Sequence, residues 1–339
     1  MRKWLIWITL FLMLMGTACA QTISPTTGLP IEGEPVAPML VVISNTEADV
    51  KYNGHTTTAQ GVGKRQAWGA QNADIIYEAP LYQDTATRLT YLFHDAIVNG
   101  ENIDAGPIRS PRILHVQLTQ MWKGGLIYAS GYEGNVRLIP ELADIRGVAF
   151  SDDATLGEPY INRVQNRAPD HRSADVRAIH GLMPDTRFQA DALVFTDEKP
   201  SDDLPNATEI KLTWGTKKRF FSRFAYDEEA GKYQWYSNKV PMKTWTDASR
   251  TEETELFFDN VIVQHVPVAF PSSRLRPESD LSAGGRAQIL TNGKLIEAKW
   301  INQNGHIHYT DENGHDIPLK RGKTYVAIWP DDLNQITVK

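Results

Sequence analysis

Cysteine occurs only once in this 339-residue sequence, at position 19. Intramolecular disulfide bonds and zinc sites with several thiolate ligands are therefore excluded as supports for the fold. Stability must come from the burial of apolar surface, and about 300 residues are enough to bury one large core or two medium-sized ones. The sequence therefore predicts ordinary, well-packed globular domains.

The residues before the cysteine predict export. Met1-Arg2-Lys3 is basic, residues 4–15 are apolar, and Gly16-Thr17-Ala18 precedes Cys19. This order is typical of a secretory signal. A membrane-spanning helix needs about 20 apolar residues, more than this run provides. We therefore expect a signal peptide over residues 1–18.

Two interpretations of the cleavage site remain open. The segment from Gly16 to Cys19 resembles a bacterial lipobox, in which the cysteine is acylated, although Gly16 stands where Leu is usual. Ala18-Cys19-Ala20 instead matches an A-x-A site, which would release a secreted protein beginning at Gln21. A lone cysteine at this position is hard to explain as core or disulfide. We therefore predict lipidation of Cys19 and a location on the outer face of the bacterial cytoplasmic membrane.

The charge balance argues against nucleic acid as a partner. The chain has 35 basic and 41 acidic residues. Removal of Arg2 and Lys3 with the signal leaves 33 against 41, a net charge of −8. Binding to phosphate backbones needs a basic face. A local cationic pocket remains compatible with this composition.

The mature chain is predicted to contain a tether and two domains. Residues 19–37 are rich in Thr, Pro and Gly and are typical of a tether. Residues 38–198 alternate apolar strand-like runs with helical patterns over 110–121 and 133–142, which predicts an N-terminal α/β domain. Residues 199–205 are typical of a linker.

The second domain, residues 206–339, is predicted to be mostly antiparallel β. Asn292-Gly293 separates two apolar runs and is a strong two-residue hairpin signal. Asn304-Gly305 and Asn313-Gly314 continue the series. The expected fold class is thus α+β or α/β, with an N-terminal α/β domain followed by a β-rich one.

Common catalytic motifs are absent from the sequence. It contains no G-x-S-x-G, H-E-x-x-H or S-x-x-K, and Gly61-Val62-Gly63-Lys64 lacks the remaining residues of a phosphate-binding loop. We therefore assign no catalytic residue and expect no cofactor.

The segment Gly106-Pro107-Ile108-Arg109-Ser110-Pro111-Arg112 is the strongest candidate site. Two arginines flank the start of a predicted helix, whose free N–H groups favour an anion. Guanidinium groups bind carboxylate or phosphate through paired hydrogen bonds. We predict an anion pocket formed by Arg109 and Arg112, joined by Arg88 and by Glu78. The structural alternative is that the arginines form salt bridges with Glu78 or Asp74.

Two weaker candidates contain histidine. His171 lies in a polar run with arginines and aspartates and could act as a general base, although such runs are more often solvated loops. His306, His308 and His315 would suit zinc if a hairpin brought them together, but histidines on exposed hairpins are commonly inert. We therefore predict no metal site.

Several segments resemble one family, the YerB-like bacterial lipoproteins. These segments are residues 27–30 (TGLP), 73–80 (ADIIYEAP), 87–88 (TR), 106–112 (GPIRSPR), 259–264 (DNVIVQ), 292–293 (NG), 300 (W), 311–314 (DENG) and 322–324 (GKT). The resemblance covers nearly the whole chain from Thr26. It implies two domains of unassigned function behind a lipoprotein signal and supplies no catalytic residues.

Three functional hypotheses follow. The first is a lipid-anchored envelope protein that binds an anionic ligand, such as a cell-wall polymer or an acidic segment of an envelope protein. The second is an envelope hydrolase or transferase with Glu78 or His171 as general acid or base and arginines stabilising negative charge. The third is a scaffold in which these residues are structural. Convergence of the arginines alone would favour the first.

Overall fold

The computed structural model describes residues 21–81, 86–130, 132–133, 136–137, 139–152, 156–164, 171–215, 220–270, 277–330 and 335–339. The predicted signal peptide and Cys19 lie outside these residues.

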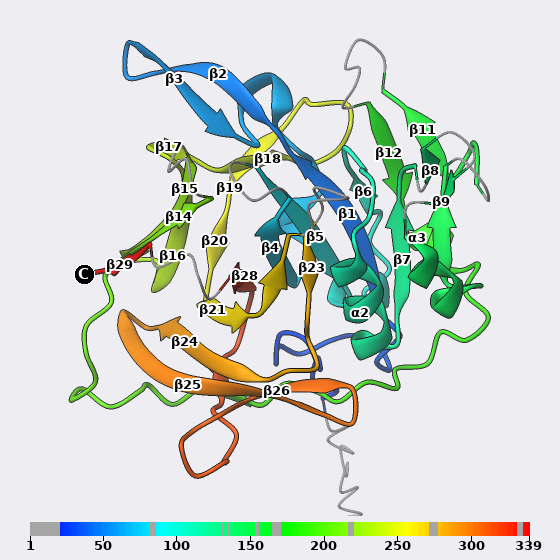
Figure 1. Ribbon diagram of the computed structural model, residues 1–339. Helices are drawn as coiled ribbons and strands as arrows, with labels where there is room; N and C mark the ends of the chain where they lie inside the picture. The colour runs from blue at the N-terminus through cyan, green and yellow to red at the C-terminus, as the bar shows by residue number, and fades with distance from the viewer. Residues whose placement is uncertain are drawn as a thin grey trace, which may run out of the picture.

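A ten-stranded mixed sheet forms the centre of the molecule (Figure 1). Its strands, in spatial order, are β10 (Ala149–Ser151), β7 (Gly125–Tyr128), β1 (Met39–Asn45), β5 (Thr87–Phe93), β4 (Ile75–Pro80), β28 (Thr324–Pro330), β21 (Asn260–Val266), β24 (Gly285–Thr291), β25 (Lys294–Gln303) and β26 (His306–Thr310).

The sheet joins both halves of the sequence. β28, from the end of the chain, lies between β4 and β21 and pairs in parallel with both. β7 also runs parallel to β1 and β10, whereas β5 is antiparallel to β1 and β4. β1 and β4 are buried along their whole length because both faces of the sheet are covered.

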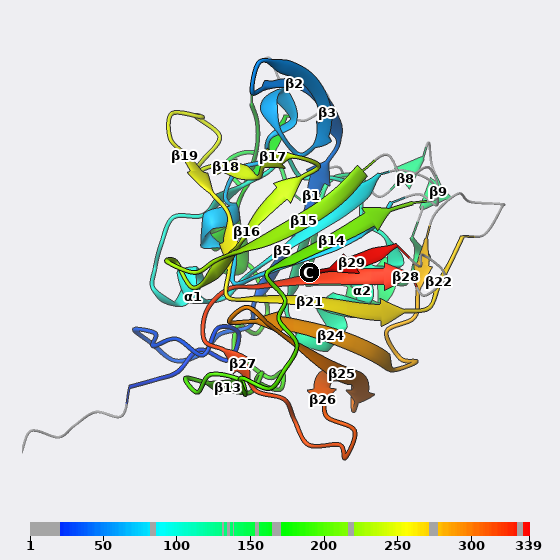
Figure 2. The ribbon, with the colours of Figure 1, turned by 90° about the vertical axis from the view of Figure 1, so that its left-hand side faces the viewer.

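A six-stranded sheet covers one face (Figure 2). Its strands are β17 (Val240–Pro241), β16 (Lys232–Ser237), β15 (Phe220–Asp227), β14 (Glu209–Trp214) and β29 (Ile336–Val338), with β20 (Phe257–Phe258) paired to β16. Between the sheets, Phe224 and Trp235 pack against Tyr325 of β28. These aromatic side chains are therefore part of the core.

Helices and small hairpins complete the described part of the chain. Helix α2 (Ile113–Trp122) covers the other face of the central sheet through Leu114, Leu118 and Trp122. The other helices are α1 (Asp95–Val98), α3 (Val176–His180) and the 3-10 helices Gly63–Arg65, Ala70–Asn72 and Pro140–Ile145. The remaining strands are β2 (Glu47–Tyr52), β3 (His55–Gln60), β6 (Asp104–Ala105), β8 (Tyr132–Glu133), β9 (Val136–Arg137), β11 (Ile161–Arg163), β12 (Arg172–Asp175), β13 (Phe195–Thr196), β18 (Lys243–Trp245), β19 (Glu253–Glu255), β22 (Val268–Ala269), β23 (Glu278–Ser279) and β27 (Leu319–Lys320).

The predicted α/β class of the N-terminal domain is wrong. The helix expected over 110–121 exists as α2, but the one expected over 133–142 is replaced by the paired strands β8 and β9 and a 3-10 helix. Pro140 occupies the first position of that 3-10 helix, where a missing N–H costs nothing. Gly134-Asn135, between the two strands in sequence, is itself a hairpin signal. The chain is therefore mostly β.

Two hairpin predictions in the second half are confirmed. Asn292 and Gly293 have φ of 50° and 73° and join β24 to β25, while Asn304 and Gly305 have φ of 54° and 88° and join β25 to β26. Positive φ at both central residues is the type I′ geometry that matches strand twist. The parallel pairing of β28 shows that this half is not purely antiparallel.

The domain boundaries remain a prediction. Residues 21–37, expected as a tether, contain the buried side chains of Ser24, Thr26 and Thr27. Among the described residues, no helix has the length and apolar character needed to cross a membrane.

Candidate functional site

The three predicted arginines lie at one edge of the central sheet. β1, β7 and β10 run parallel and end at this edge, and Arg88, at the start of antiparallel β5, pairs with Ser44 there. The Arg109 backbone connects two of these strands: its N–H donates to the Val42 carbonyl (2.8 Å), and its carbonyl accepts from Ala129 N–H (3.0 Å). The carboxyl ends of parallel strands are a common place for ligands in open sheets.

Helix α2 begins at the same edge. Arg112 is its N-cap residue, and the Arg112 guanidinium donates to the Pro111 carbonyl (2.7 Å). Arg88 and Arg112 are buried, whereas Arg109 is half-buried. Arg109 is therefore the arginine best placed to meet a ligand.

His115 adds a buried donor that the sequence analysis missed. Its side chain is only 1% exposed, and Nδ1 accepts the Arg112 backbone N–H at 2.7 Å. The proton of the neutral ring must then lie on Nε2. Among the residues that the structure describes, Nε2 has no hydrogen-bond partner. We refer to Arg88, Arg109, Arg112 and His115 as the arginine edge.

The electrostatics keep His115 neutral. Burial lowers the pKa of its imidazole to about 3, and the charges of Arg112 and Arg88 lower it further, against the raising effect of the Arg112 backbone, whose carbonyl oxygen lies 3.2 Å from Nδ1. An anion at this edge would thus meet guanidinium charge and a neutral N–H donor. A buried donor without an acceptor costs about 1–3 kcal/mol, which a bound acceptor would recover.

His171 precedes Arg172, whose backbone contacts the segment that contains Arg109. Arg172 accepts the Ile108 N–H at its carbonyl (2.9 Å) and forms an ion pair with Asp152, which also accepts from Ser130 N–H (3.1 Å). His171 itself is half-buried, and its carbonyl accepts from Val164 N–H (2.6 Å). The arginine next to His171 is thus engaged with a carboxylate.

Glu78 lies on the opposite face of the sheet from Arg88. Arg88 pairs with Ala79, and successive side chains of a strand point to opposite faces. The Glu78 carboxylate is 1% exposed and accepts from Thr87 Oγ1 (2.5 Å), Ser222 Oγ (2.6 Å) and the Tyr325 hydroxyl. Glu78 therefore connects the two sheets and is not brought together with the arginines.

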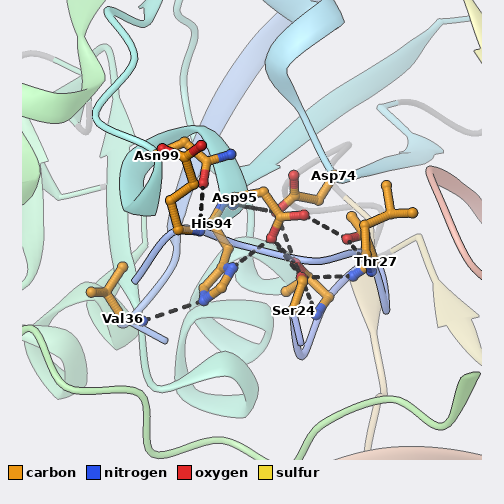
Figure 3. Close-up of polar contacts among 10 residues, drawn as sticks. Ser24, Thr27, Val36, Asp74, His94, Asp95 and Asn99 are labelled. Atoms are coloured by element: carbon orange, nitrogen blue, oxygen red, sulfur yellow. Dashed lines mark hydrogen bonds and ion pairs between the residues drawn. The ribbon is translucent and has the colours of Figure 1, made fainter. Parts of the chain in front are cut away.

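Asp74 belongs to a second polar cluster, shown in Figure 3. Its Oδ2 accepts from the backbone N–H groups of His94 (2.9 Å) and Asp95 (3.0 Å) and from Thr26 Oγ1 (2.9 Å). Asp95 in turn accepts from Ser24 Oγ and Thr27 Oγ1, both at 2.5 Å. The cluster binds the N-terminal segment to the body of the protein.

The Asp74–His94–Asp95 cluster has spacing that a metal ion could use, since its ligand atoms lie within 4.8 Å of one another. However, His94 Nε2 accepts from the Val36 N–H (3.3 Å) while Nδ1 contacts Asp95 Oδ1 at 2.7 Å (Figure 3). The ring then donates from Nδ1 and has no lone pair for a metal. These contacts favour a structural role.

Burial and the Asp95 charge raise the pKa of Asp74 to about 7, against the lowering effects of His94 and Lys323. The pKa of Asp95 is lowered by contacts with His94, Ser24 and Thr27 that outweigh its desolvation. A single charge on this pair is thus favoured near neutral pH.

The three late histidines separate into two groups. His306 Nε2 and His308 Nε2 lie 3.9 and 3.7 Å from Asp191 Oδ2, whereas the exposed His315 contacts Asp311 at 3.3 Å. His306 Nδ1 accepts from Asp191 N–H (3.1 Å), so its proton lies on Nε2. That tautomer is a donor and not a metal ligand.

The fold consists of two packed sheets, and Arg88, Arg109 and Arg112 lie near the carboxyl ends of the parallel strands β1, β7 and β10. Family models described as the N-terminal and C-terminal domains of a protein of unknown function, DUF3048, match residues 60–189 and 210–326. The chain belongs to this YerB-like family.

Two comparisons with single proteins agree with that assignment. The chain is 23% identical over 352 residues to a Bacillus subtilis (strain 168) protein named "Putative lipoprotein YerB", covering 98% of this chain and 96% of that protein. It also matches the crystal structure of YerB from Bacillus subtilis with a TM-score of 0.73 and 20% identity, over 94% of this chain and 100% of that one. The structural likeness supports the fold alone.

Proposed function

We propose that this protein is a lipid-anchored envelope protein that binds an anionic ligand at the arginine edge. The observation that carries the proposal is the buried His115 Nε2–H, a donor without an acceptor among the described residues, beside Arg88 and Arg112. Phosphate or carboxylate groups of a cell-wall polymer, or an acidic segment of an envelope protein, have the matching chemistry.

Membrane attachment rests on two independent observations. Cys19 follows a secretory signal pattern, and a relative that spans nearly the whole chain bears a lipoprotein name. Acylation of Cys19 would place the described residues outside the cytoplasmic membrane. We propose the same attachment for this chain.

The positions of the candidate residues favour binding over hydrolysis or transfer. Glu78 points to the other face of the sheet, where its carboxylate is already surrounded by hydroxyl donors. His171 would be the remaining general base, but the arginine that follows it is paired with Asp152. The arginines and His115 together supply hydrogen-bond donors, which suit binding of an anion.

The test is binding of the chain from Gln21 to Lys339 to purified cell-envelope fractions, compared with an Arg109→Ala/Arg112→Ala variant. Loss of two charge-assisted contacts should cost on the order of 3 kcal/mol, which is more than a hundredfold in affinity. An Arg187→Ala/Arg286→Ala variant is the control, because it removes equal charge from exposed positions.

A His115→Asn variant separates the specific site from general attraction. Asn can accept the Arg112 N–H but offers no donor at the Nε2 position. We expect weaker binding by this variant and unchanged binding by the control variant. Equal binding by the wild type and both site variants, all correctly folded, would show that the arginines are structural and do not bind the ligand.

A further inference from the structure

An open groove of about 270 Å³ lies beside the second half of α2, whereas Arg112 lies at the start of that helix. Cavities of small-molecule sites begin at about 300 Å³, so the groove has room for a small ligand. Three segments meet there: α2, the loop after β23, and the end of β25 with its turn into β26. Four polar side chains (Gln117, Gln120, Ser282 and Asn302) and two apolar ones (Met121 and Leu281) line it.

Hydrogen bonds fix the two segments that meet α2. Asn302 Nδ2 donates to the Leu281 carbonyl (2.9 Å), and Asn302 Oδ1 accepts from Gly305 N–H (2.9 Å). Ser282 donates to Asp280 Oδ1 from its backbone N–H (2.9 Å) and from Oγ (2.6 Å). The second N–H of the Asn302 amide and the lone pairs of Ser282 Oγ are then available to a ligand.

Helix α2 contributes a buried acceptor. Gln120 and Met121 follow Gln117 by three and four positions, so both are its neighbours on the helix surface. Gln117 Oε1 is buried and has no hydrogen-bond partner in the part of the chain that the structure describes. Buried acceptors are normally satisfied, so a ligand that donates an N–H or O–H suits this position. Gln120 is exposed, and its amide can donate to the same ligand.

The charges around the groove favour a neutral ligand. Of the residues with described positions, none with a charged side chain lines the groove. The hydrogen bonds from Ser282 lower the pKa of Asp280, so this carboxylate is ionised near pH 7. An anion would therefore meet negative charge without a lining cation to bind it. Met121 and Leu281 are buried and add apolar surface for a methyl group or a ring face.

We propose that this groove binds an N-acetylhexosamine unit of an uncharged glycan. The acetamido group of such a sugar combines one N–H donor, one carbonyl acceptor and one methyl group. The N–H donates to Gln117 Oε1, the carbonyl accepts from the Gln120 amide, and the methyl packs on the apolar lining. The ring hydroxyls bind Ser282 Oγ and Asn302 Nδ2. Because the groove is open, the unit can belong to a longer chain. A peptide amide has the same donor and acceptor but no hydroxyls for the last two groups.

The experiment is a ligand-observed NMR titration of the chain from Gln21, which contains every described element. The probes are chitotriose (a linear trimer of N-acetylglucosamine), cellotriose (the same linkage with hydroxyls in place of the acetamido groups) and N-acetyl-trialanine amide. We expect saturable binding of chitotriose and at least fivefold weaker binding of the other two, because each lacks part of the donor and acceptor set. Equally strong binding of cellotriose or of the peptide would overturn the proposal.

Four variants test the location. Gln117→Leu removes the buried acceptor and should weaken chitotriose binding about fivefold to tenfold. Ser282→Trp fills the groove from an exposed position and should weaken binding at least tenfold. Thr56→Trp adds the same ring to an exposed position of the β2–β3 hairpin and should leave binding unchanged. Arg109→Ala should also leave it unchanged, because the trimer is uncharged.

Two results would overturn the proposed site itself. One is equal chitotriose binding by the wild type and a correctly folded Ser282→Trp variant. The other is the absence of saturable chitotriose binding by the wild type at millimolar concentration.

Discussion

At the scale of single residues, the same side-chain type has different roles according to the face on which it lies. Glu78 and Arg88 are both buried in neighbouring strands, yet the pleat sends one toward the six-stranded sheet and the other toward α2. The alternation was readable from the sequence, but the register that places Arg88 opposite Ala79 was not. Arg88 and Arg112 both lower the pKa of His115, while the anion pocket formed with Arg109 stays a prediction. The sequence analysis missed His115 because it lies within the apolar pattern of its helix.

Asp74 gives a prediction about pH and stability. Its folded pKa of about 7 lies above the ordinary value of 3.8, so the unfolded chain loses this proton first. The contribution of Asp74 to stability is therefore full below pH 3.8 and is lost as pH rises through about 7. Asp74→Asn keeps an oxygen for the three N–H and O–H donors and removes the titration.

At pH 8 we expect the free energy of unfolding of Asp74→Asn to exceed that of the wild type by roughly 1–3 kcal/mol, so the variant unfolds at a higher denaturant concentration. The two proteins should converge below pH 4. Urea unfolding at several pH values measures the difference. A variant that is destabilised equally at every pH would show that the carboxylate, and not its oxygen alone, supports the cluster.

At the scale of elements, local sequence patterns predicted which segments form strands or helices but not which strands pair with each other. The runs at 39–43 and 87–93 became β1 and β5, and the helix after Pro111 became α2. No periodicity could reveal that β28 lies between β4 and β21, because strand order depends on contacts between residues far apart in sequence. β4 has β5 on one side and β28, from the end of the chain, on the other. The α/β interpretation itself failed because the segment expected as a second helix forms β8, β9 and a 3-10 helix.

The N-terminal segment gives the prediction at this scale. A tether would be dispensable, but Ser24, Thr26 and Thr27 donate to Asp95 and Asp74 from buried positions. Removal of residues 21–30 leaves those carboxylates without three donors. We expect a loss of about 2–4 kcal/mol in the free energy of unfolding, since each lost contact to a charged group costs about 1 kcal/mol or more. Unchanged urea unfolding would support the tether interpretation.

At the scale of the whole molecule, two polar clusters lie at opposite edges of the central sheet. Asp74 precedes β4 and Asp95 follows β5, at the edge where β1 begins. The arginine edge lies where β1 ends, and a seven-residue strand is about 20 Å long. Only five positions separate Cys19 from Ser24, which span at most about 17 Å. If Cys19 is acylated, the polar cluster around Asp74 and Asp95 is held near the bilayer, and the arginine edge faces away from the bilayer.

Energy transfer from protein to bilayer tests this orientation. The acylated full chain, with one fluorophore attached at Arg109→Cys or at the exposed Leu29→Cys, is reconstituted in vesicles that carry an acceptor dye at the lipid surface. We expect stronger transfer from position 29 than from position 109, because the N-terminal segment is fixed to the body through Asp95. Equal transfer from both positions would mean that the body tumbles freely on its anchor. Stronger transfer from position 109 would place the arginines at the lipid headgroups and identify phospholipid as their anion.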